Sequence, residues 1–237
     1  MNEDARMERT VSVAEVLDPL TQKIKEMEAN FKANKTAVLT DMDQRRIEHA
    51  RNQRANKIKE LRAQWNAPVR HEANSANLDM EGEWGKKFKL LKAALGTGMF
   101  FALVGGRGPG KTQMAFELMK ECTAQLKSAY FLTATEFFVE VKDTYHRDTT
   151  KTEKDVLARF KQYRLLVIDE VGKRGQSEWE NNLLFEVINS RYNAMLDTVI
   201  MDNNEMEAFK RLIGPSLVSR LGETGSIIVC DWPSYRI

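Results

Sequence analysis

Five short apolar runs mark the second half of the chain, and each is separated from the next by a segment with helical spacing. Runs of four or five residues between polar boundaries are typical of buried strands. We expect strands at Phe100–Val104, Ala129–Leu132, Leu165–Ile168, Thr198–Met201 and Ile227–Cys230. Alternation of strands with helices predicts an α/β fold, with a parallel sheet flanked by helices on both faces. In such folds the loops at the carboxyl ends of the strands form the ligand-binding site.

The N-terminal part has a different pattern. Residues 15–66 are rich in helix-forming residues and contain no proline after Pro19, so they predict a helical region. Between residues 44 and 70, eight basic residues stand against two acidic ones. Four apolar residues recur near helical spacing in this stretch: Ile47, Ile58, Leu61 and Trp65. Two interpretations remain open: a solvated helix against the rest of its own chain, or a helix that binds a partner protein or nucleic acid.

A boundary between two regions is expected where this pattern ends. Residues 66–85 contain proline, asparagine and glycine without a sustained period, as a linker would. We therefore predict a helical N-terminal region at 1–66, a linker at 67–85 and an α/β domain at 86–237.

Composition excludes several classes of protein. With 237 residues and 42% hydrophobic content, the chain has enough apolar surface for a folded core. The first ten residues lack a signal-peptide pattern, and the longest charge-free stretch, residues 93–106, is too short to span a bilayer. We expect a cytoplasmic protein without a membrane partner. Cys122 and Cys230 stand far apart, which predicts neither a zinc site nor a disulfide framework.

A glycine-rich motif follows the first apolar run. Gly105–Thr112 fits the pattern G-x-x-x-x-G-K-[ST], and we call this segment the P-loop. In this pattern backbone N–H groups surround a triphosphate, Lys111 reaches its β and γ phosphates, and the Thr112 hydroxyl binds Mg²⁺. The motif predicts binding of ATP or GTP. The predicted nucleotide-binding residues are Gly105, Gly106, Arg107, Gly108, Pro109, Gly110, Lys111, Thr112 and Gln113.

The third apolar run ends in two acidic residues. Arg164–Glu170 reads RLLVIDE, which predicts a buried strand with carboxylates at its carboxyl end. Beside the P-loop, Asp169 is expected in the Mg²⁺ shell together with Thr112. Glu170 is then placed to orient and polarise an attacking water, which is the chemistry of a nucleotide hydrolase.

These motifs and those that follow them resemble the AAA+ ATPases of the DnaC/DnaI helicase-loader family. The resemblance covers Trp65 to Arg236 and is carried by GGRGPGKT, LLVIDEVG, TVIMDNNEME, LIGPSLVSRLG and DWPSYR, in that order. It implies an AAA+ P-loop core that hydrolyses ATP with Mg²⁺. It also implies ATP-dependent loading of a hexameric replicative DNA helicase onto single-stranded DNA in replication initiation, with self-association through the ATP site. A phage-encoded loader fits the same pattern.

Three further site residues are implied by this resemblance. Asn203 matches the sensor-I residue, which helps to place the water that attacks the γ phosphate. The alternative is that Asn203 only forms a turn. Arg220 matches the arginine finger that reaches the ATP site of a neighbouring subunit, and its plain alternative is a surface arginine. Arg236 matches the sensor-II arginine, and because Ile237 follows directly we expect no C-terminal lid domain.

The chain also departs from the family pattern. Arg107 stands where a small residue or proline is frequent, Pro109 where threonine is frequent, and Asp202 where threonine commonly precedes the sensor. The first 45 residues contain no zinc-binding cysteines, so the resemblance to the zinc-bearing DnaI subgroup does not extend to them. The resemblance therefore supports the helicase-contacting part less than any other part.

A route for single-stranded DNA is implied near the same end of the sheet. Lys142, Tyr145, Ser177 and Trp179 match positions that face DNA in the family. Aromatic rings beside cations suit non-specific single-strand binding, since bases stack on the rings and phosphates pair with the cations. The alternative is that both rings pack on the helices that bear them.

Two other functions remain open at the level of the sequence. A transposition helper ATPase of the IstB type has similar core motifs and would require duplex DNA and a transposase. A helicase-binding adaptor or inhibitor would use nucleotide for structure alone, for which neither Glu170 nor Arg220 is needed.

Overall fold

The computed structural model describes residues 23, 25–27, 41–75, 78–146 and 148–235, and these fall into two compact units. The first unit is Met1–Lys59 and the second is Glu60–Ile237. Arg236 and most of the first 40 residues lie outside the described residues. Of the helical region predicted over 15–66, the structure describes α2 (Asp41–Arg62), while most of residues 15–40 lie outside the described part of the chain.

Within the first unit, α2 is polar and largely exposed. Ile47 and Ile58, from the predicted apolar stripe, are half-buried. Exposed basic residues cover much of the remaining surface of this helix: Arg45, Arg46, Arg51, Lys57 and Lys59.

The second unit is built on a parallel sheet with the strand order β2-β3-β4-β1-β5. The strands are β1 (Phe100–Val104), β2 (Ala129–Thr133), β3 (Leu165–Asp169), β4 (Asp197–Met201) and β5 (Ser226–Val229). All five predicted strands are confirmed, with ends that differ by one residue at most. The order places β4 between β1, which leads into the P-loop, and β3, which ends at Asp169.

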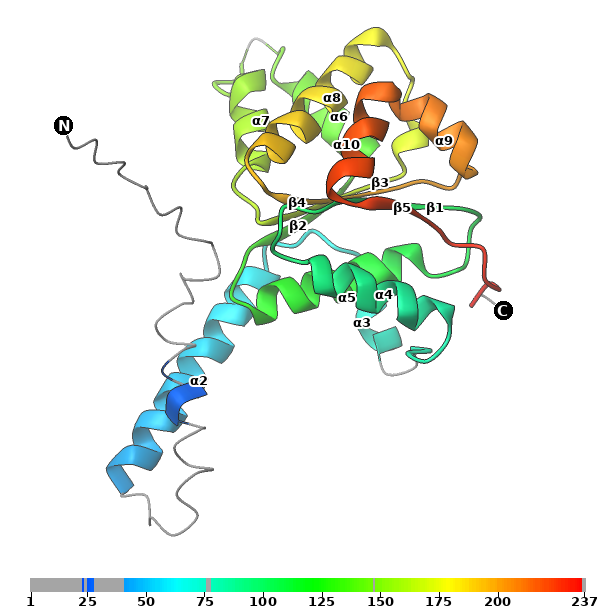
Figure 1. The fold of residues 1–237 in the computed structure, drawn as a ribbon. Coiled ribbons are helices and arrows are strands. Elements are labelled where there is room, and N and C mark those ends of the chain that lie inside the picture. The colour runs from blue at the N-terminus through cyan, green and yellow to red at the C-terminus, as the bar shows by residue number, and fades with distance from the viewer. Residues whose placement is uncertain (1–22, 24, 28–40, 76–77, 147, 236–237) are drawn as a thin grey trace, which may run out of the picture. The chain divides into compact units, whose positions relative to one another are not determined.

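Helices cover both faces of this sheet (Figure 1). One face carries α3 (His71–Asn74), α4 (Glu83–Ala94) and α5 (Lys111–Ala124). The other carries α6 (Ala134–Asp143), α7 (Glu153–Phe160), α8 (Glu178–Asn193), α9 (Met206–Ile213) and α10 (Pro215–Thr224). A short 3-10 turn, η3 (Val171–Lys173), follows β3. The predicted α/β class is confirmed.

Local sequence explains where the helices on the second face begin. Thr133, Thr152 and Ser177 are the N-caps of α6, α7 and α8, and each forms a capping box with an acidic residue three positions later. The reciprocal hydrogen bonds satisfy backbone N–H groups that no helical carbonyl can reach. Because Thr133 is also the last residue of β2, α6 begins directly at the carboxyl edge of the sheet, where the predicted site lies.

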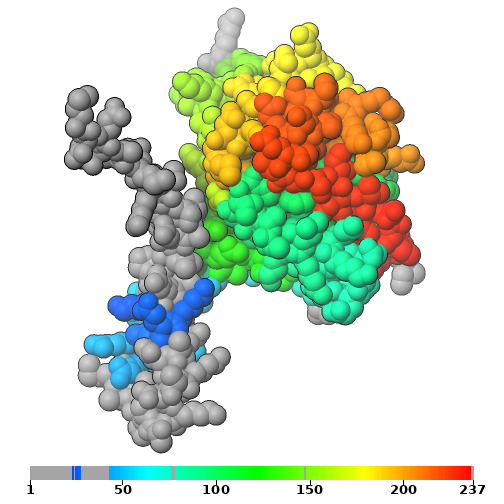
Figure 2. Space-filling model, viewed as in Figure 1, coloured from blue at the N-terminus to red at the C-terminus, as the bar shows by residue number. Residues whose placement is uncertain are grey.

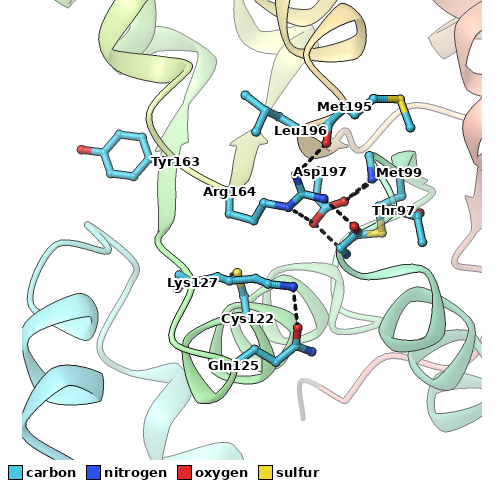
Figure 3. A network of polar contacts seen from close by, with 12 residues as sticks. Thr97, Met99, Cys122, Gln125, Lys127, Tyr163, Arg164, Met195, Leu196 and Asp197 are labelled. Atoms are coloured by element: carbon cyan, nitrogen blue, oxygen red, sulfur yellow. Dashed lines mark hydrogen bonds and ion pairs between the residues drawn. The ribbon is translucent and has the colours of Figure 1, made fainter. Parts of the chain in front are cut away.

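A buried ion pair fixes the opposite, amino-terminal edge of the sheet (Figure 3). The Asp197 carboxylate accepts hydrogen bonds from the N–H groups of Gly96 (2.8 Å), Gly98 (2.9 Å) and Met99 (3.1 Å). Arg164 Nε lies 3.5 Å from the same carboxylate, while its Nη1 donates to the Met195 carbonyl. These contacts join the starts of β1, β3 and β4, and so align the strands whose other ends form the site.

The segment that we predicted as a linker, residues 67–85, differs from that prediction. It contains α3 and the start of α4, and the second unit already begins at Glu60. Trp65 and Trp84 are 4% and 1% exposed and belong to the core between α4, α5 and the sheet. The Trp65 carbonyl also accepts from Phe131 N–H on the outer edge of β2 (2.8 Å). Pro68 begins a turn, and its carbonyl accepts from His71 N–H (3.2 Å), directly before α3.

Candidate functional site

The P-loop joins β1 to α5 at the carboxyl edge of the sheet. Gly105, Gly108 and Gly110 have positive φ angles of 119°, 107° and 88°, a region that side chains disfavour. A Cβ on Gly105 would lie 2.7 Å from the Cys230 carbonyl oxygen. Lys111 Nζ donates to the Gly105 and Gly106 carbonyls, both at 2.6 Å. The loop is thus a backbone cradle at the start of a helix, which is suited to a phosphate chain.

Two tryptophans that we did not predict as site residues support this loop. Trp84 Nε1 donates to the Gly110 carbonyl (3.3 Å), and Trp232 Nε1 donates to the Pro109 carbonyl (2.7 Å). Tyr235 N–H donates to Gly108 O (3.0 Å). In the space-filling view the red C-terminal segment lies on the surface between the orange and the teal parts of the second unit (Figure 2). Trp232 and Tyr235 lie more than a hundred residues from the loop and Trp84 lies 26 residues from Gly110, so no local sequence pattern could indicate these contacts.

Asp169 and Thr112 meet beside the P-loop. The Thr112 hydroxyl donates to Asp169 Oδ2 (3.2 Å), and the Glu170 N–H donates to Asp169 Oδ1 (2.7 Å). Burial raises the pKa of the Asp169 carboxyl above its usual value, with a smaller contribution from the charge of Glu170. A hydroxyl and a carboxylate facing the same point are the hard oxygen ligands that suit Mg²⁺, with the remaining positions left for phosphate and water. The residues therefore fit the ion that the motif implies.

Glu170 follows with a left-handed backbone, at φ 57° and ψ 39°. Its carboxylate is ion-paired with Lys173 Nζ, three residues later in the turn η3. The Lys173 N–H also donates to the Glu170 carbonyl (2.9 Å). Both residues line the cleft, so this ion pair lies at its edge.

The turn after β4 carries Asn203 to the same place. Asn203 lines the cleft together with Lys111, Asp169 and Glu170. Its neighbour Asp202 is 3% exposed and holds the turn through backbone N–H groups, as described below. The structure thus brings together the predicted phosphate, metal and water-positioning groups.

These side chains open into a cleft of about 850 Å³. Such a volume lies within the range of small-molecule and cofactor sites. Besides the strand-end residues, it is lined by residues of the segment that we took for a linker: Pro68, Arg70, His71, Asn74, Leu78 and Asp79. That segment is thus one wall of the cleft.

Gln113, predicted to bind nucleotide, has a structural role at this wall. Its Nε2 donates to the His71 carbonyl (3.0 Å) and to Glu117 Oε1 (2.9 Å), and its Oε1 lies 2.8 Å from His71 Nδ1. The side chain joins α3 to α5. Gln113 still lines the cleft, but its amide is already hydrogen-bonded within the protein.

Arg220 does not reach the cleft of its own chain, since it is not among the lining residues. Its guanidinium carbon lies 5.1 Å and 5.3 Å from the ring centres of Phe185 and Tyr192, and Nη1 donates to the Ser216 carbonyl (2.9 Å). The predicted sensor-II residue, Arg236, lies outside the described residues.

Three of the four predicted DNA residues form one cluster. Lys142 Nζ lies 5.4 Å from the Trp179 ring centre, and Trp179 Nε1 donates to the Tyr145 hydroxyl (3.2 Å). Tyr145 is 59% exposed, whereas Trp179 is half-buried against the core and Phe138. The hydroxyl of Ser177 accepts from Glu180 N–H as the N-cap of α8. Lys142, Tyr145 and Trp179 are called the aromatic cluster below.

The two cysteines contribute no reactive group. Burial raises the pKa of both thiols, Cys122 and Cys230, to about 12. Both sulfurs are free and buried, and neither belongs to a group of metal-ligating residues within the described part of the chain.

A parallel sheet with a P-loop, an acidic strand end and a polar turn after the strand between them is the nucleotide-binding fold of AAA+ proteins. Solved structures support this fold. A DnaC helicase loader matches with a TM-score of 0.58 at 18% identity over 68% of this chain and 99% of that one. DnaA from Aquifex aeolicus with bound AMPPCP matches with a TM-score of 0.52 at 19% identity, over 62% of this chain and 47% of that one.

Within that class, the chain belongs to the family of IstB-like ATP binding proteins, which matches residues 9–221. The replicative helicase loader DnaC of Escherichia coli K12 is 25% identical over 217 residues, covering 87% of this chain and 88% of that relative. The resemblance found in the sequence is thereby confirmed. Among the residues that the structure describes, none of the helices has the length and apolar character needed to cross a lipid bilayer.

Proposed function

We propose that the chain is an ATPase that loads a hexameric replicative DNA helicase onto single-stranded DNA. The observation that carries this proposal is the similarity to DnaC, because it extends over 87% of the chain and 88% of the relative. It therefore includes much of the region before the nucleotide-binding unit. A match confined to the P-loop core would support nucleotide binding alone.

The geometry supports a role for each residue at the cleft. Lys111 and the P-loop amides would hold the phosphates of ATP, and Thr112 and Asp169 would hold Mg²⁺. The ion would neutralise charge on the β and γ phosphates. Glu170 would orient a water and accept its proton as the bond from water oxygen to the γ phosphorus forms and the bond to ADP breaks. Asn203 would fix the position of that water.

The helicase contact is assigned to the N-terminal region. A pull-down tests this assignment by comparing the full chain with a truncation that lacks residues 1–59, against the bacterial replicative helicase with and without ATP. This truncation keeps Trp65 and the wall of the cleft, so it should still bind ATP. Capture by the full chain and loss by the truncation would support the loader. Failure of the full chain to bind any host helicase would refute it.

Single-stranded DNA is assigned to the aromatic cluster. Base stacking contributes about 1–3 kcal/mol per base, and Lys142 adds a phosphate contact. The double variant Tyr145→Ala, Trp179→Ala should bind single-stranded DNA more weakly and ATP as before. Tyr163→Ala, two residues before β3 and thus at the amino-terminal edge of the sheet, is the matched aromatic control. Unchanged DNA binding in the double variant would exclude this assignment.

A transposition helper is the second candidate, because the matching family is named after IstB. It predicts a preference for duplex over single-stranded DNA, which a competition measurement between the two would reveal. An adaptor that uses nucleotide only for structure predicts that Glu170→Gln hydrolyses ATP as fast as the natural chain, in the presence of DNA and helicase.

A further inference from the structure

Asp202 is a buried carboxylate near the cleft, and the proposed chemistry gives it no role. It is the first residue after β4, it is 3% exposed, and the strand that bears it lies between β1 and β3. An ionised carboxylate is rarely buried to this degree unless hydrogen bonds satisfy its oxygens. Its surroundings therefore show what it does.

Both carboxylate oxygens accept backbone N–H groups, and they come from different loops. Oδ2 accepts from Gly172 (2.5 Å), in the turn η3 directly after Glu170. Oδ1 accepts from Asn204 (2.8 Å), which lies on the other side of Asn203. One side chain thus joins the turn that carries Glu170 to the turn that carries Asn203.

The same turn is also tied to the P-loop strand. Asp202 N–H donates to the Leu103 carbonyl (3.0 Å), and the Asn204 carbonyl accepts from Gly105 N–H (3.1 Å), at the first glycine of the P-loop. The position of residues 202–204 is thereby fixed relative to the phosphate cradle. The Asp202 carboxylate extends this fixed frame to the loop after β3.

The backbone at Gly172 lies very close to the Asp202 carboxylate. A Cβ at this position would lie 2.5 Å from Asp202 Oδ2 and 2.8 Å from Asn204 Nδ2. Only glycine lets the backbone come this near to the carboxylate. The buried Arg174, whose Nη2 donates to the Leu212 carbonyl of α9 (3.0 Å), adds an opposite charge in the neighbourhood of Asp202.

We infer that Asp202 is a positioning residue for ATP hydrolysis, which sets the distance between the Asn203 amide and the Glu170 carboxylate over the γ phosphate. This inference rests on the proposed ATPase function. Two groups that act on one water must be placed together, and a displacement of about 1 Å can cost about 10²-fold in rate. A threonine at this position has one side-chain oxygen, so it cannot hold both N–H groups in this manner.

The test is Asp202→Asn, which keeps the shape but replaces one acceptor oxygen with an NH₂ group facing an N–H. We expect kcat for ATP hydrolysis to fall about 10- to 100-fold while the Kd for ATP changes little. The Gly172 amide should exchange its hydrogen faster in the nucleotide-free variant. Gly172→Ala should lower kcat in the same way without removing charge near Arg174, and Asp148→Asn, at an exposed aspartate, is the control.

Three results would overturn the inference: unchanged kcat in Asp202→Asn, loss of ATP affinity in step with kcat, or unchanged exchange at Gly172. A natural chain that hydrolyses ATP no faster than Glu170→Gln would instead refute the proposed function itself. If the natural chain hydrolyses ATP and Asp202→Asn hydrolyses it at the same rate, only the role of Asp202 is refuted. A melting temperature measured for each variant identifies any that fail to fold.

Discussion

At the scale of single residues, the predicted water-activating group is held by a neighbour. The Glu170 carboxylate is ion-paired with Lys173, whose side chain is half-exposed. Exposed ion pairs contribute only about 0.2–1 kcal/mol, so a phosphate or another anion can displace this one. The pair is a weak restraint on the residue that is proposed to accept the proton of water.

We therefore expect Lys173→Gln to raise ATP hydrolysis in the absence of DNA by a few-fold, because the carboxylate is then available to water. Steady-state phosphate release at equal protein concentration measures this effect. Lys161→Gln, at an exposed lysine after α7, should leave the rate unchanged. A decrease in Lys173→Gln would instead show that Lys173 contacts the nucleotide.

The buried Asp169 carboxylate is expected to lower the free energy of unfolding at neutral pH. Because burial raises its pKa, the folded state binds a proton more tightly than the unfolded chain does. The free energy of unfolding thus falls as pH rises from the ordinary aspartate pKa through the raised one. Above that window the whole cost of ionising Asp169 is present.

Asp169→Asn should therefore stabilise the nucleotide-free protein at neutral pH and abolish the Mg²⁺-dependent part of ATP binding. Urea unfolding between about pH 4 and about pH 7 should show the difference from the natural chain growing with pH. Asp148→Asn is again the exposed control. A stability difference that is constant over this range would contradict the assignment.

At the scale of elements, the apolar runs predicted the sheet because a buried parallel strand is apolar on both faces and ends where polar residues begin. The end of β3 in turn predicted that Asp169 lies at the carboxyl edge of the sheet, whereas Asn203, in the turn after β4, was indicated by the family resemblance. The wall formed by residues 67–85 could not be predicted in this way. Its packing depends on contacts such as Trp84 with Gly110, and composition alone gives no sign of them.

Trp65 closes the outer edge of β2, and its loss should be costly. It is 4% exposed, meets Phe116 edge to face at 5.5 Å, and its carbonyl accepts from Phe131. Trp65→Ala should reduce the free energy of unfolding by about 3–5 kcal/mol. Val69→Ala, in the same segment but 84% exposed, should have little effect. Equal losses in urea unfolding would show that Trp65 is not part of the core.

At the scale of the whole molecule, the position of Arg220 outside its own cleft predicts that one chain alone does not form a complete ATPase site. The residue lies over Phe185 and Tyr192 and does not line its own cleft. To act as an arginine finger, it must leave these rings and reach the site of a second copy. Hydrolysis per chain should then rise with protein concentration.

A mixing experiment tests this directly. Arg220→Ala keeps its nucleotide site and should lose about 10³-fold or more in rate, while Lys111→Ala keeps its finger and loses its nucleotide site. A mixture of the two should hydrolyse ATP faster than the sum of the separate variants. Arg211→Ala, at an exposed arginine of the neighbouring α9, is the matched control. No gain on mixing would exclude a finger supplied in trans.

Trp84 and Trp232, which hydrogen-bond to the P-loop, should make the intrinsic fluorescence of the protein sensitive to nucleotide. The chain has four tryptophans, and two of them donate to carbonyls of Pro109 and Gly110. Nucleotide that binds this loop changes the field around both rings, so the intrinsic fluorescence should shift when ATP is added. The shift should disappear in the variant Trp84→Phe, Trp232→Phe and persist in Trp65→Phe, with affinity followed by calorimetry. The protein thus contains its own spectroscopic label for nucleotide binding.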